Sequence, residues 1–246
     1  MGTIAENIEA VRARIGQAAA RSGRDARDIR LICVTKSRAP SEIGEAIAAG
    51  EYELGENRAQ EFMEKYDTIQ DIALADSKKP NIMWNFIGQL QRNKVKYLAG
   101  KISLIHSVDS FKLAEEIDAR AQRAGEPAGI LIQMNTAGEK QKSGVALSES
   151  EALVNEIEQR LSYVKVQGLM AVVPDVLDPE DVRGYFRDAR RTFEALAEKR
   201  GGAEADFKHL SMGMTHDFEI AVEEGATIVR VGTAIFGPRG SDHQSV

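Results

Sequence analysis

A lysine at the end of an apolar stretch is the first residue in this chain whose position suggests chemistry. Lys36 follows residues 31–34, a short apolar run with two β-branched members, which predicts a strand buried on both faces. Partial burial lowers the pKa of an amine and makes it a nucleophile towards aldehydes, which is how a lysine forms a Schiff base. Lys36 is therefore a candidate Schiff-base lysine. The alternative is a solvated lysine that merely ends the strand.

Two later loops combine glycine with small hydroxyl residues, which is the composition of an anion site. They are residues 211–215 and 232–234, and helix starts are predicted at Thr215 and Ala234. Glycine lets backbone N–H groups approach an anion, and each helix N-terminus favours an anion by about 0.3–1 kcal/mol. The two loops predict a phosphate site, although ordinary strand-to-helix turns require the same residue types.

An arginine inside a predicted strand is a third candidate. Arg230 interrupts the apolar run 228–231, and alternation along a strand places it on the same face as Ile228 and Gly232. A buried guanidinium requires an acceptor. That acceptor is either a bound ligand or, as the alternative, a carboxylate in a salt bridge within the core.

These residues need a scaffold that brings strand ends together, and the chain repeats such a unit. A helix that ends in glycine is followed at once by an apolar strand at four places, namely Gly50, Gly100, Gly125 and Gly225. Eight strands are predicted, at residues 31–34, 52–54, 83–86, 102–106, 129–134, 164–172, 207–210 and 227–231. Repeated βα units in about 250 residues favour an α/β fold with a single (β/α)8 TIM barrel, over residues 1–246 as one domain. A doubly wound open sheet is the alternative, but no GxGxxG fingerprint follows any strand.

Capping patterns mark where several helices begin. Thr3 with Glu6 predicts an extra helix before the first strand, and Ser148 with Glu151 predicts a capping box further on. Asp178, followed by proline, predicts another N-cap.

Composition excludes several classes of function. There are 32 Lys and Arg against 38 Asp and Glu, a formal net charge of −6, and no basic run that predicts nucleic-acid binding. No apolar stretch approaches the roughly 20 residues that a membrane span needs, and the charged first 15 residues are not a signal peptide. A single cysteine, Cys33, excludes an internal disulfide and is consistent with a cytoplasmic protein.

A strand-end lysine, a phosphate site and an inward arginine together describe a pocket for pyridoxal 5′-phosphate (PLP). The chain resembles the pyridoxal phosphate homeostasis proteins, which share a barrel with the N-terminal domain of alanine racemases. The matching segments, in order, are VTK (34–36), LGENRAQE (54–61), FIGQLQRNK (86–94), NTAGEKQKSG (135–144), GLM (168–170), LSMGM (210–214) and RVGTAIFG (230–237). Each segment alone is weak evidence, but the set is specific.

The resemblance implies a role for each matching residue. Lys36 would carry the Schiff base, and Arg230 would contact the ring nitrogen or the phosphate. The phosphate would be held by Ser211, Gly232 and Thr233, and the pocket would be lined by Asn57 and Met212. One position departs from the family pattern: Asn85 stands where histidine is usual, so a proton-transfer role there is in doubt because asparagine does not titrate near neutrality.

Three functions fit these observations. The first, which we favour, is a PLP carrier in intracellular PLP homeostasis, with PLP-requiring apoenzymes as partners and with little or no catalysis. The second is a PLP-dependent amino-acid racemase or decarboxylase, and the third is a phosphosugar enzyme in which Lys36 is an electrostatic ligand. Racemisation requires proton donors on both faces of the α-carbon. Related racemases take the second donor from a domain after the barrel, whereas this chain ends seven residues after Arg239.

The remaining candidates are assigned to structure. Cys33 is predicted to be a packed thiol, Met212 and Met214 to pack as well, and His106 to be a strand-end residue. We expect no metal site, because no metal-ligand spacing connects His209, His216 and His243. A solvated helix face is predicted for Arg92, Lys94 and Lys96.

Overall fold

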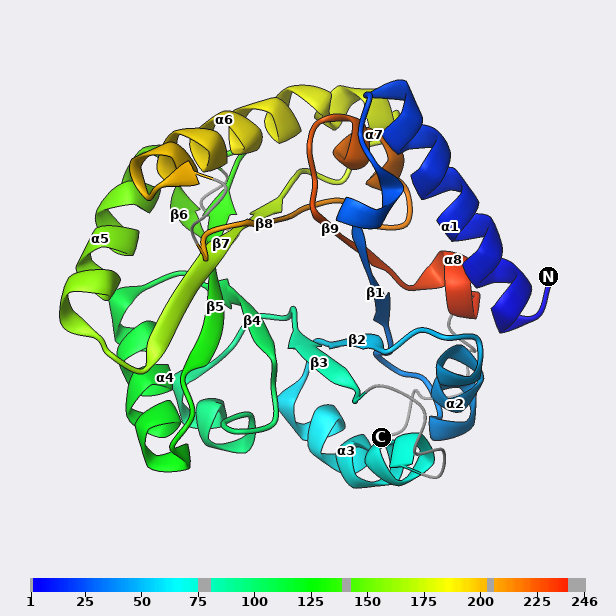
Figure 1. The fold of residues 1–246 in the computed structure, drawn as a ribbon, viewed down its shortest axis with the longest axis horizontal. Coiled ribbons are helices and arrows are strands. Elements are labelled where there is room, and N and C mark those ends of the chain that lie inside the picture. The colour runs from blue at the N-terminus through cyan, green and yellow to red at the C-terminus, as the bar shows by residue number, and fades with distance from the viewer. Residues whose placement is uncertain (1, 75–80, 139–142, 203–205, 239–246) are drawn as a thin grey trace.

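The computed structural model describes residues 2–74, 81–138, 143–202 and 206–238. Eight parallel strands form a closed barrel, because β9 pairs with β1 and β4 pairs with β5 (Figure 1). They are β1 (Arg30–Val34), β2 (Glu53–Glu56), β3 (Met83–Phe86), β4 (Leu104–Val108), β5 (Ala128–Asn135), β7 (Val164–Val172), β8 (His209–Ser211) and β9 (Ile228–Val231). A two-residue strand, β6 (Val145–Ala146), pairs with the carboxyl end of β5. The predicted (β/α)8 TIM barrel is confirmed.

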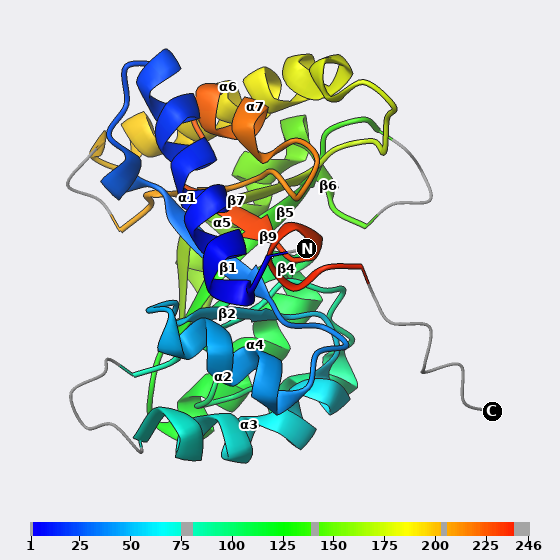
Figure 2. The same cartoon turned by 90° about the vertical axis from the view of Figure 1, so that its right-hand side faces the viewer.

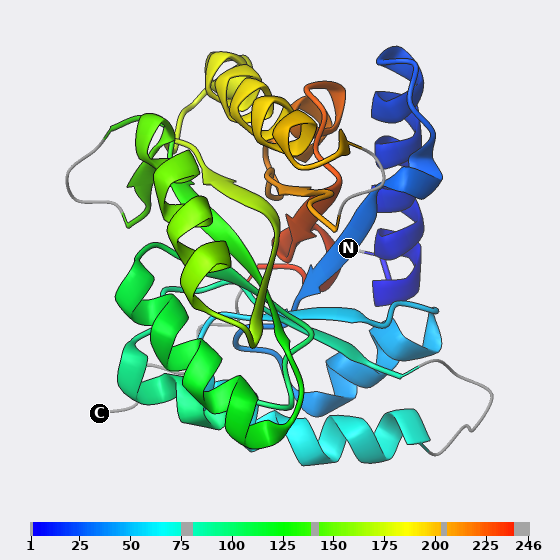
Figure 3. The ribbon, with the colours of Figure 1, turned by 60° about the vertical axis from the view of Figure 1, so that its left-hand side comes forward.

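Helices surround this barrel. The α-helices are α1 (Ile4–Arg21), α2 (Pro40–Ala48), α3 (Ala59–Leu74), α4 (Phe111–Ala124), α5 (Ser150–Arg160), α6 (Arg183–Lys199), α7 (Phe218–Glu223) and α8 (Thr233–Phe236). Short 3-10 helices are η1 (Ala26–Asp28), η2 (Arg92–Tyr97), η3 (Leu147–Glu149) and η4 (Pro179–Val182). The predicted extra helix is α1, which packs beside α7 and α8 (Figure 2). Figure 3 shows α4 and α5 on the outer side of β5 and β7. None of the helices in the described ranges is long and apolar enough to cross a membrane.

Some of the predicted helix boundaries are confirmed and others are wrong. The capping box between Thr3 and Glu6 is present, and Asp178 accepts a hydrogen bond from the N–H of Glu180 at 2.9 Å. The four glycines that follow helices all have positive φ, from 71° at Gly100 to 102° at Gly225. The box predicted at Ser148 is wrong, because the chain turns as η3 first and α5 begins at Ser150.

Two apolar layers explain why the strands are buried on both faces. Outward side chains pack under the helices, and an inner layer fills the barrel with Ile32, Leu104, Leu131, Met170 and Ile228. Side chains two residues further along each strand point the same way and lie nearer the carboxyl ends. Above Leu104 and Ile228 these are His106 and Arg230. The interior therefore changes from apolar to polar towards one mouth of the barrel, which is where a site is expected.

Candidate functional site

A pocket of about 550 Å³ opens at the carboxyl ends of the strands. This volume suits a small cofactor. Its walls come from the loops after β1, β2, β3, β7, β8 and β9. Five of the seven residues predicted for the site lie in its lining: Lys36, Asn57, Arg230, Gly232 and Thr233. The topology thus brings together residues up to about 200 positions apart in the chain.

The other two predicted site residues, Ser211 and Met212, lie behind the wall of this pocket. Both are fully buried and neither belongs to the lining. The hydroxyl of Ser211 contacts the Nδ1 atom of His106 at 2.9 Å and accepts a hydrogen bond from Nη1 of Arg230 at 2.6 Å. Its side chain therefore faces protein groups rather than the pocket.

The turn that carries Lys36 has an unusual backbone. Ser37 has φ = 59°, the one positive value at a non-glycine residue among those the structure describes. This conformation costs about 1–3 kcal/mol. The N–H of Ser37 donates to the carboxylate of Glu61, and the N–H of Thr35 donates to the Gly55 carbonyl oxygen at 2.9 Å. Since a hydrogen bond to a charged group contributes about 1.5–3 kcal/mol, the bond to Glu61 can offset the strain.

A buried lysine on α3 holds the same turn from inside. The Nζ atom of Lys65 donates to the Thr35 carbonyl at 2.8 Å, to Glu56 Oε1 at 2.9 Å and to Glu61 Oε1 at 2.6 Å. Three oxygens therefore satisfy the three N–H groups of one ammonium. Glu56 also accepts from the Thr35 hydroxyl at 2.7 Å. Burial raises the pKa of Glu56, and the charge of Lys65 opposes that rise. Thr35, Glu56, Glu61 and Lys65 are called the lysine clamp below.

The opposite wall presents Arg230. Its side chain is almost fully buried, and it donates to Ser211 and, at 3.2 Å, to the Ala171 carbonyl. Burial lowers the pKa of Arg230 to about 10, and the nearby charge of Asp217 opposes this shift. Among the residues that the structure describes, no carboxylate forms an ion pair with Arg230. The salt bridge considered as an alternative is therefore not found in the described chain, and the guanidinium charge faces the pocket.

The two loops predicted to hold an anion differ in the backbone N–H groups that they leave available. Hydrogen bonds within α8 begin with the N–H of Ile235, so the N–H groups of Thr233 and Ala234 have no partner in the helix. On the α7 side, the N–H of Met214 is taken by Asp217 Oδ1 at 2.5 Å. The N-cap of α7 is thus Asp217 and not Thr215, because the chain makes a turn before the helix begins. Burial raises the pKa of Asp217.

Asn57 supplies a buried polar atom without a partner. Its Oδ1 atom has no hydrogen-bond partner although it is buried beside the pocket. The loop after β3 is packed tightly against it, since a Cβ on Gly88 would lie 2.1 Å from the Asn57 carbonyl oxygen. An acceptor held rigidly in this way is suited to a hydroxyl or N–H group of a ligand.

Several residues of the site were not predicted from the sequence. His106 lies within β4, fully buried, and is not the strand-end residue that was expected. His216 and Arg38 line the pocket, and Lys65 supports it. Met214 is 47% exposed, so the prediction that it packs is wrong. Alternation with Leu104 could have placed His106 inside the barrel, whereas nothing in the local pattern distinguishes Lys65 from a solvated helix lysine.

Other predicted features lie elsewhere or cannot be placed. Cys33 is a buried thiol, as predicted, and burial raises its pKa. Arg92 and Lys96 are exposed on η2. Within the described ranges no group of three or more His, Cys, Asp or Glu residues could hold a metal ion. Outside the described residues lie His243, Arg239 and positions 139–142.

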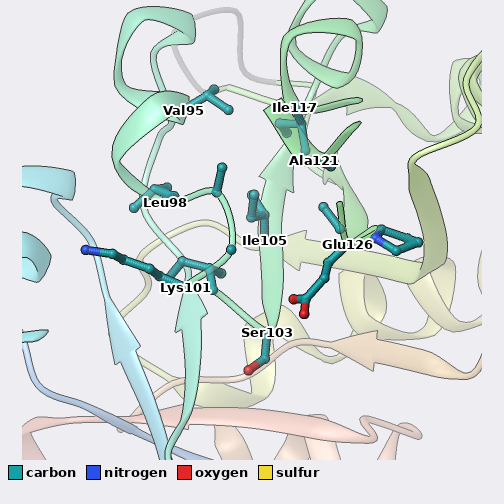
Figure 4. Close-up of a pocket in the computed structure, with 13 residues that line it drawn as sticks. Val95, Leu98, Lys101, Ser103, Ile105, Ile117, Ala121 and Glu126 are labelled. Carbon is teal, nitrogen blue, oxygen red and sulfur yellow. The ribbon is translucent and has the colours of Figure 1, made fainter. Parts of the chain in front are cut away.

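A second pocket, of about 250 Å³, lies at the other end of the barrel between η2 and α4 (Figure 4). Its centre is apolar, formed by residues such as Leu98, Ile105 and Ile117. The ammonium of Lys101 is directed away from that centre and lies 4.6 Å from the ring of Tyr66. Glu126 and Ser103 add a carboxylate and a hydroxyl, but the described residues of this lining include no arginine, so it suits an anion less than the first pocket does.

Comparison with known proteins decides the family. The model of the alanine racemase N-terminal domain matches residues 2–240. The pyridoxal phosphate homeostasis protein of Aquifex aeolicus is 44% identical over 234 residues, which are 95% of this chain and 97% of that protein. The chain belongs to the pyridoxal phosphate homeostasis protein family. The resemblance inferred from the sequence segments is confirmed.

Solved structures of similar chains share the barrel. A protein from Bifidobacterium adolescentis superposes with a TM-score of 0.87 at 37% identity, over 95% of this chain and 94% of that one. PipY of Synechococcus elongatus, solved with PLP bound, has a TM-score of 0.79 at 31% identity. The match covers 95% of this chain and 100% of PipY. The names of the homeostasis relatives describe a balance of PLP and not a reaction.

Proposed function

We propose that this chain binds PLP through Lys36 and serves in PLP homeostasis, with little or no catalysis of its own. The observation that carries the proposal is that Lys36 and Arg230 line the same pocket together with Gly232 and Thr233. When bound, PLP supplies an aldehyde that forms a Schiff base with a lysine amine. Binding of PLP by the similar protein PipY supports the same ligand here.

The pocket fits PLP in charge and in hydrogen bonding. Three basic residues of the lining, Lys36, Arg38 and Arg230, outnumber its two acidic ones, Asp175 and Asp217, which suits a phosphate ester. Gly232 lines the pocket and lets β9 pack closely on β1 at the strand end, because a Cβ there would lie 3.3 Å from Val34 Cβ. The unpartnered Oδ1 of Asn57 offers an acceptor for a ring hydroxyl.

The charge of Arg230 also argues against strong catalysis. A guanidinium next to the ring nitrogen would hold that nitrogen unprotonated and weaken the ring as an electron sink. The alternative function, a PLP-dependent racemase or decarboxylase, requires a second proton-transfer group. His216 lines the pocket and is the described residue that favours this alternative.

Two measurements test the proposal. Borohydride reduction of the PLP-loaded protein, followed by peptide mass mapping, should give a pyridoxyl adduct on Lys36, and an adduct on another lysine or on none would contradict the assignment. Incubation with each common amino acid in deuterated water should give no α-proton exchange at enzymatic rates. Turnover of order 1 per second or faster for any amino acid would establish the enzyme instead.

We propose further that the phosphate supplies much of the affinity. Pyridoxal without phosphate should bind at least tenfold more weakly, since a hydrogen bond to a charged group contributes about 1.5–3 kcal/mol and 1.4 kcal/mol is a factor of ten. Equal affinity for pyridoxal and PLP would place the anion site elsewhere.

The wider role follows from the same pocket. We propose that residues 1–246 form one PLP-binding domain in the cytoplasm that releases PLP to PLP-requiring apoenzymes. Loaded protein mixed with an apoenzyme should restore its activity faster than spontaneous release of PLP allows. A single unfolding transition by fluorescence and circular dichroism would agree with one domain, and cell fractionation would check the compartment.

A further inference from the structure

A continuous series of buried hydrogen bonds crosses the barrel behind the pocket. Arg230 Nη1 donates to Ser211 Oγ at 2.6 Å, and Ser211 Oγ lies 2.9 Å from His106 Nδ1. His106 Nε2 lies 3.2 Å from Asn85 Oδ1, and Asn85 Nδ2 donates to the carbonyls of β2 and β3 at Leu54 (3.3 Å) and Met83 (3.1 Å). Ser211, His106 and Asn85 are fully buried, so water does not compete for these groups.

The chemistry of the end residue fixes the direction of every bond in the series. Because the amide nitrogen of Asn85 is used by two carbonyls, its oxygen faces His106 and can only accept. Nε2 of His106 must therefore carry the proton. In the neutral ring Nδ1 is then an acceptor. It accepts a hydrogen bond from the Ser211 hydroxyl, whose oxygen in turn accepts one from Arg230.

The charges around His106 favour the neutral ring. Arg230 on β9, Arg30 on β1 and His209 on β8 all act on it, and the carboxylate of Glu53 is already held by Arg30 in a bidentate pair. Burial first, and then the charges of Arg230 and Arg30, lower the pKa of His106 well below its ordinary value. In a protonated ring both nitrogens would donate, and the hydroxyl hydrogen of Ser211 would lose its acceptor on Nδ1.

We propose that His106, oriented by Asn85, is a positioning residue that acts through Ser211 to hold the Arg230 guanidinium in the direction of PLP. This inference rests on the proposed function. It assigns Ser211 a different task from that of a phosphate ligand, since its hydroxyl serves the arginine. The series contains no carboxylate, so it orients the guanidinium without neutralising the charge that the ligand needs.

The first test does not require the ligand. NMR of the unliganded protein with ¹⁵N-labelled histidine should show His106 protonated at Nε2 and not at Nδ1, without titration between pH 5 and pH 8. His106→Gln identifies the signal. A proton on Nδ1, or titration near neutrality, would overturn the proposal.

The second test separates an indirect role of Ser211 from direct phosphate binding. PLP affinity is measured for Ser211→Ala, Arg230→Met and the double variant, with folding checked by circular dichroism. We expect Ser211→Ala to weaken binding about tenfold and to add little once Arg230 is replaced, because the two residues act as one unit. Thr233→Ala, on the α8 side, is the matched control. Its loss of PLP affinity should multiply with the loss caused by Arg230→Met when both substitutions are combined.

Two further results would decide against the proposal. In the first, the loss of affinity from Ser211→Ala multiplies fully with that from Arg230→Met and vanishes when pyridoxal replaces PLP. Ser211 would then be a phosphate ligand. Failure of the unsubstituted protein to bind PLP would instead reject the proposed function, and the proposal with it, before any variant is compared. The histidine spectrum still reports the hydrogen-bond direction in that case.

Discussion

The two walls of the pocket are built in contrasting ways. Behind Lys36 lies the lysine clamp, in which one buried ammonium contacts two carboxylates and a backbone carbonyl. Behind Arg230 lies a series of uncharged groups, Ser211, His106 and Asn85. Charged groups thus hold the turn of one functional side chain, whereas the groups that contact the other are uncharged.

The difference follows from what each wall must do. The backbone at Ser37 is in a conformation that costs about 1–3 kcal/mol, so charge-assisted hydrogen bonds are needed to hold it. Arg230 has no such strain, but its charge must remain available to a ligand. A carboxylate beside it would satisfy the guanidinium inside the protein, whereas neutral acceptors orient it and leave its charge.

The largest expected effect is on stability, at the clamp. Lys65→Met should lower the free energy of unfolding of the unliganded protein by about 3–5 kcal/mol, because the buried carboxylate of Glu56 and the partly buried one of Glu61 lose their cation. Urea denaturation measures this change. Lys96→Met is the control, since Lys96 is exposed and such changes stay within about 0.5 kcal/mol. A loss below about 1 kcal/mol at Lys65 would show that the clamp is not what holds the Lys36 turn.

The opposite wall should respond in its ligand affinity rather than in its stability. Arg230→Met removes a buried cation that has no carboxylate partner in the described chain, so the free energy of unfolding should change by less than about 1.5 kcal/mol. PLP affinity should fall tenfold or more, as isothermal titration would show.

Arg30, an inward arginine that does have a carboxylate partner, gives the matched control. Arg30 is held by Glu53 in two hydrogen bonds of 2.6 Å at the far end of the barrel. Arg30→Met should lower stability and leave PLP affinity unchanged. If both arginines behaved alike, the contrast between charged and neutral support would be wrong.

The sequence predicted the functional side chain of each wall. Lys36 could be found because it follows the end of an apolar strand, and Arg230 because it interrupts one at a position that alternation places inside the barrel. The barrel itself follows from eight apolar runs separated by helices, and glycines with positive φ confirm where those helices end.

The supporting residues could not be found in this way, for physical reasons. Lys65 reaches the Lys36 turn from α3, thirty residues away, and its burial depends on how that helix packs. His106 could be placed inside by its alternation with Leu104, but its partners come from β3 and β8. Whether a buried polar side chain is satisfied is decided by closure of the barrel, which no local pattern encodes.

The smallest expected effects are on how the free energy of unfolding depends on pH, and they should differ in sign between the two walls. Burial lowers the pKa of His209, next to the neutral series on β8, from 6.5 to about 4. Between these values the unfolded chain binds more protons than the folded one, so His209 makes stability fall as the pH drops from about 6.5 to about 4. Glu56 behaves in the opposite way. Its pKa is raised above 4.5, so as the pH falls towards 4.5 the folded state binds the proton before the unfolded state does. Glu56 therefore makes the free energy of unfolding rise as the pH drops through that range.

Two variants measured by urea denaturation from pH 7 to pH 4 would therefore diverge. His209→Gln keeps an acceptor for Arg30, whose Nη1 lies 3.2 Å from the imidazole, and should make the loss of stability in acid shallower. Glu56→Gln keeps an acceptor for Lys65 and should make it steeper. Each slope change is at most about 1.4 kcal/mol per pH unit, the value for one proton that titrates fully. Slopes that change in the same direction in both variants would mean that the two walls do not differ in how burial acts on their titratable groups.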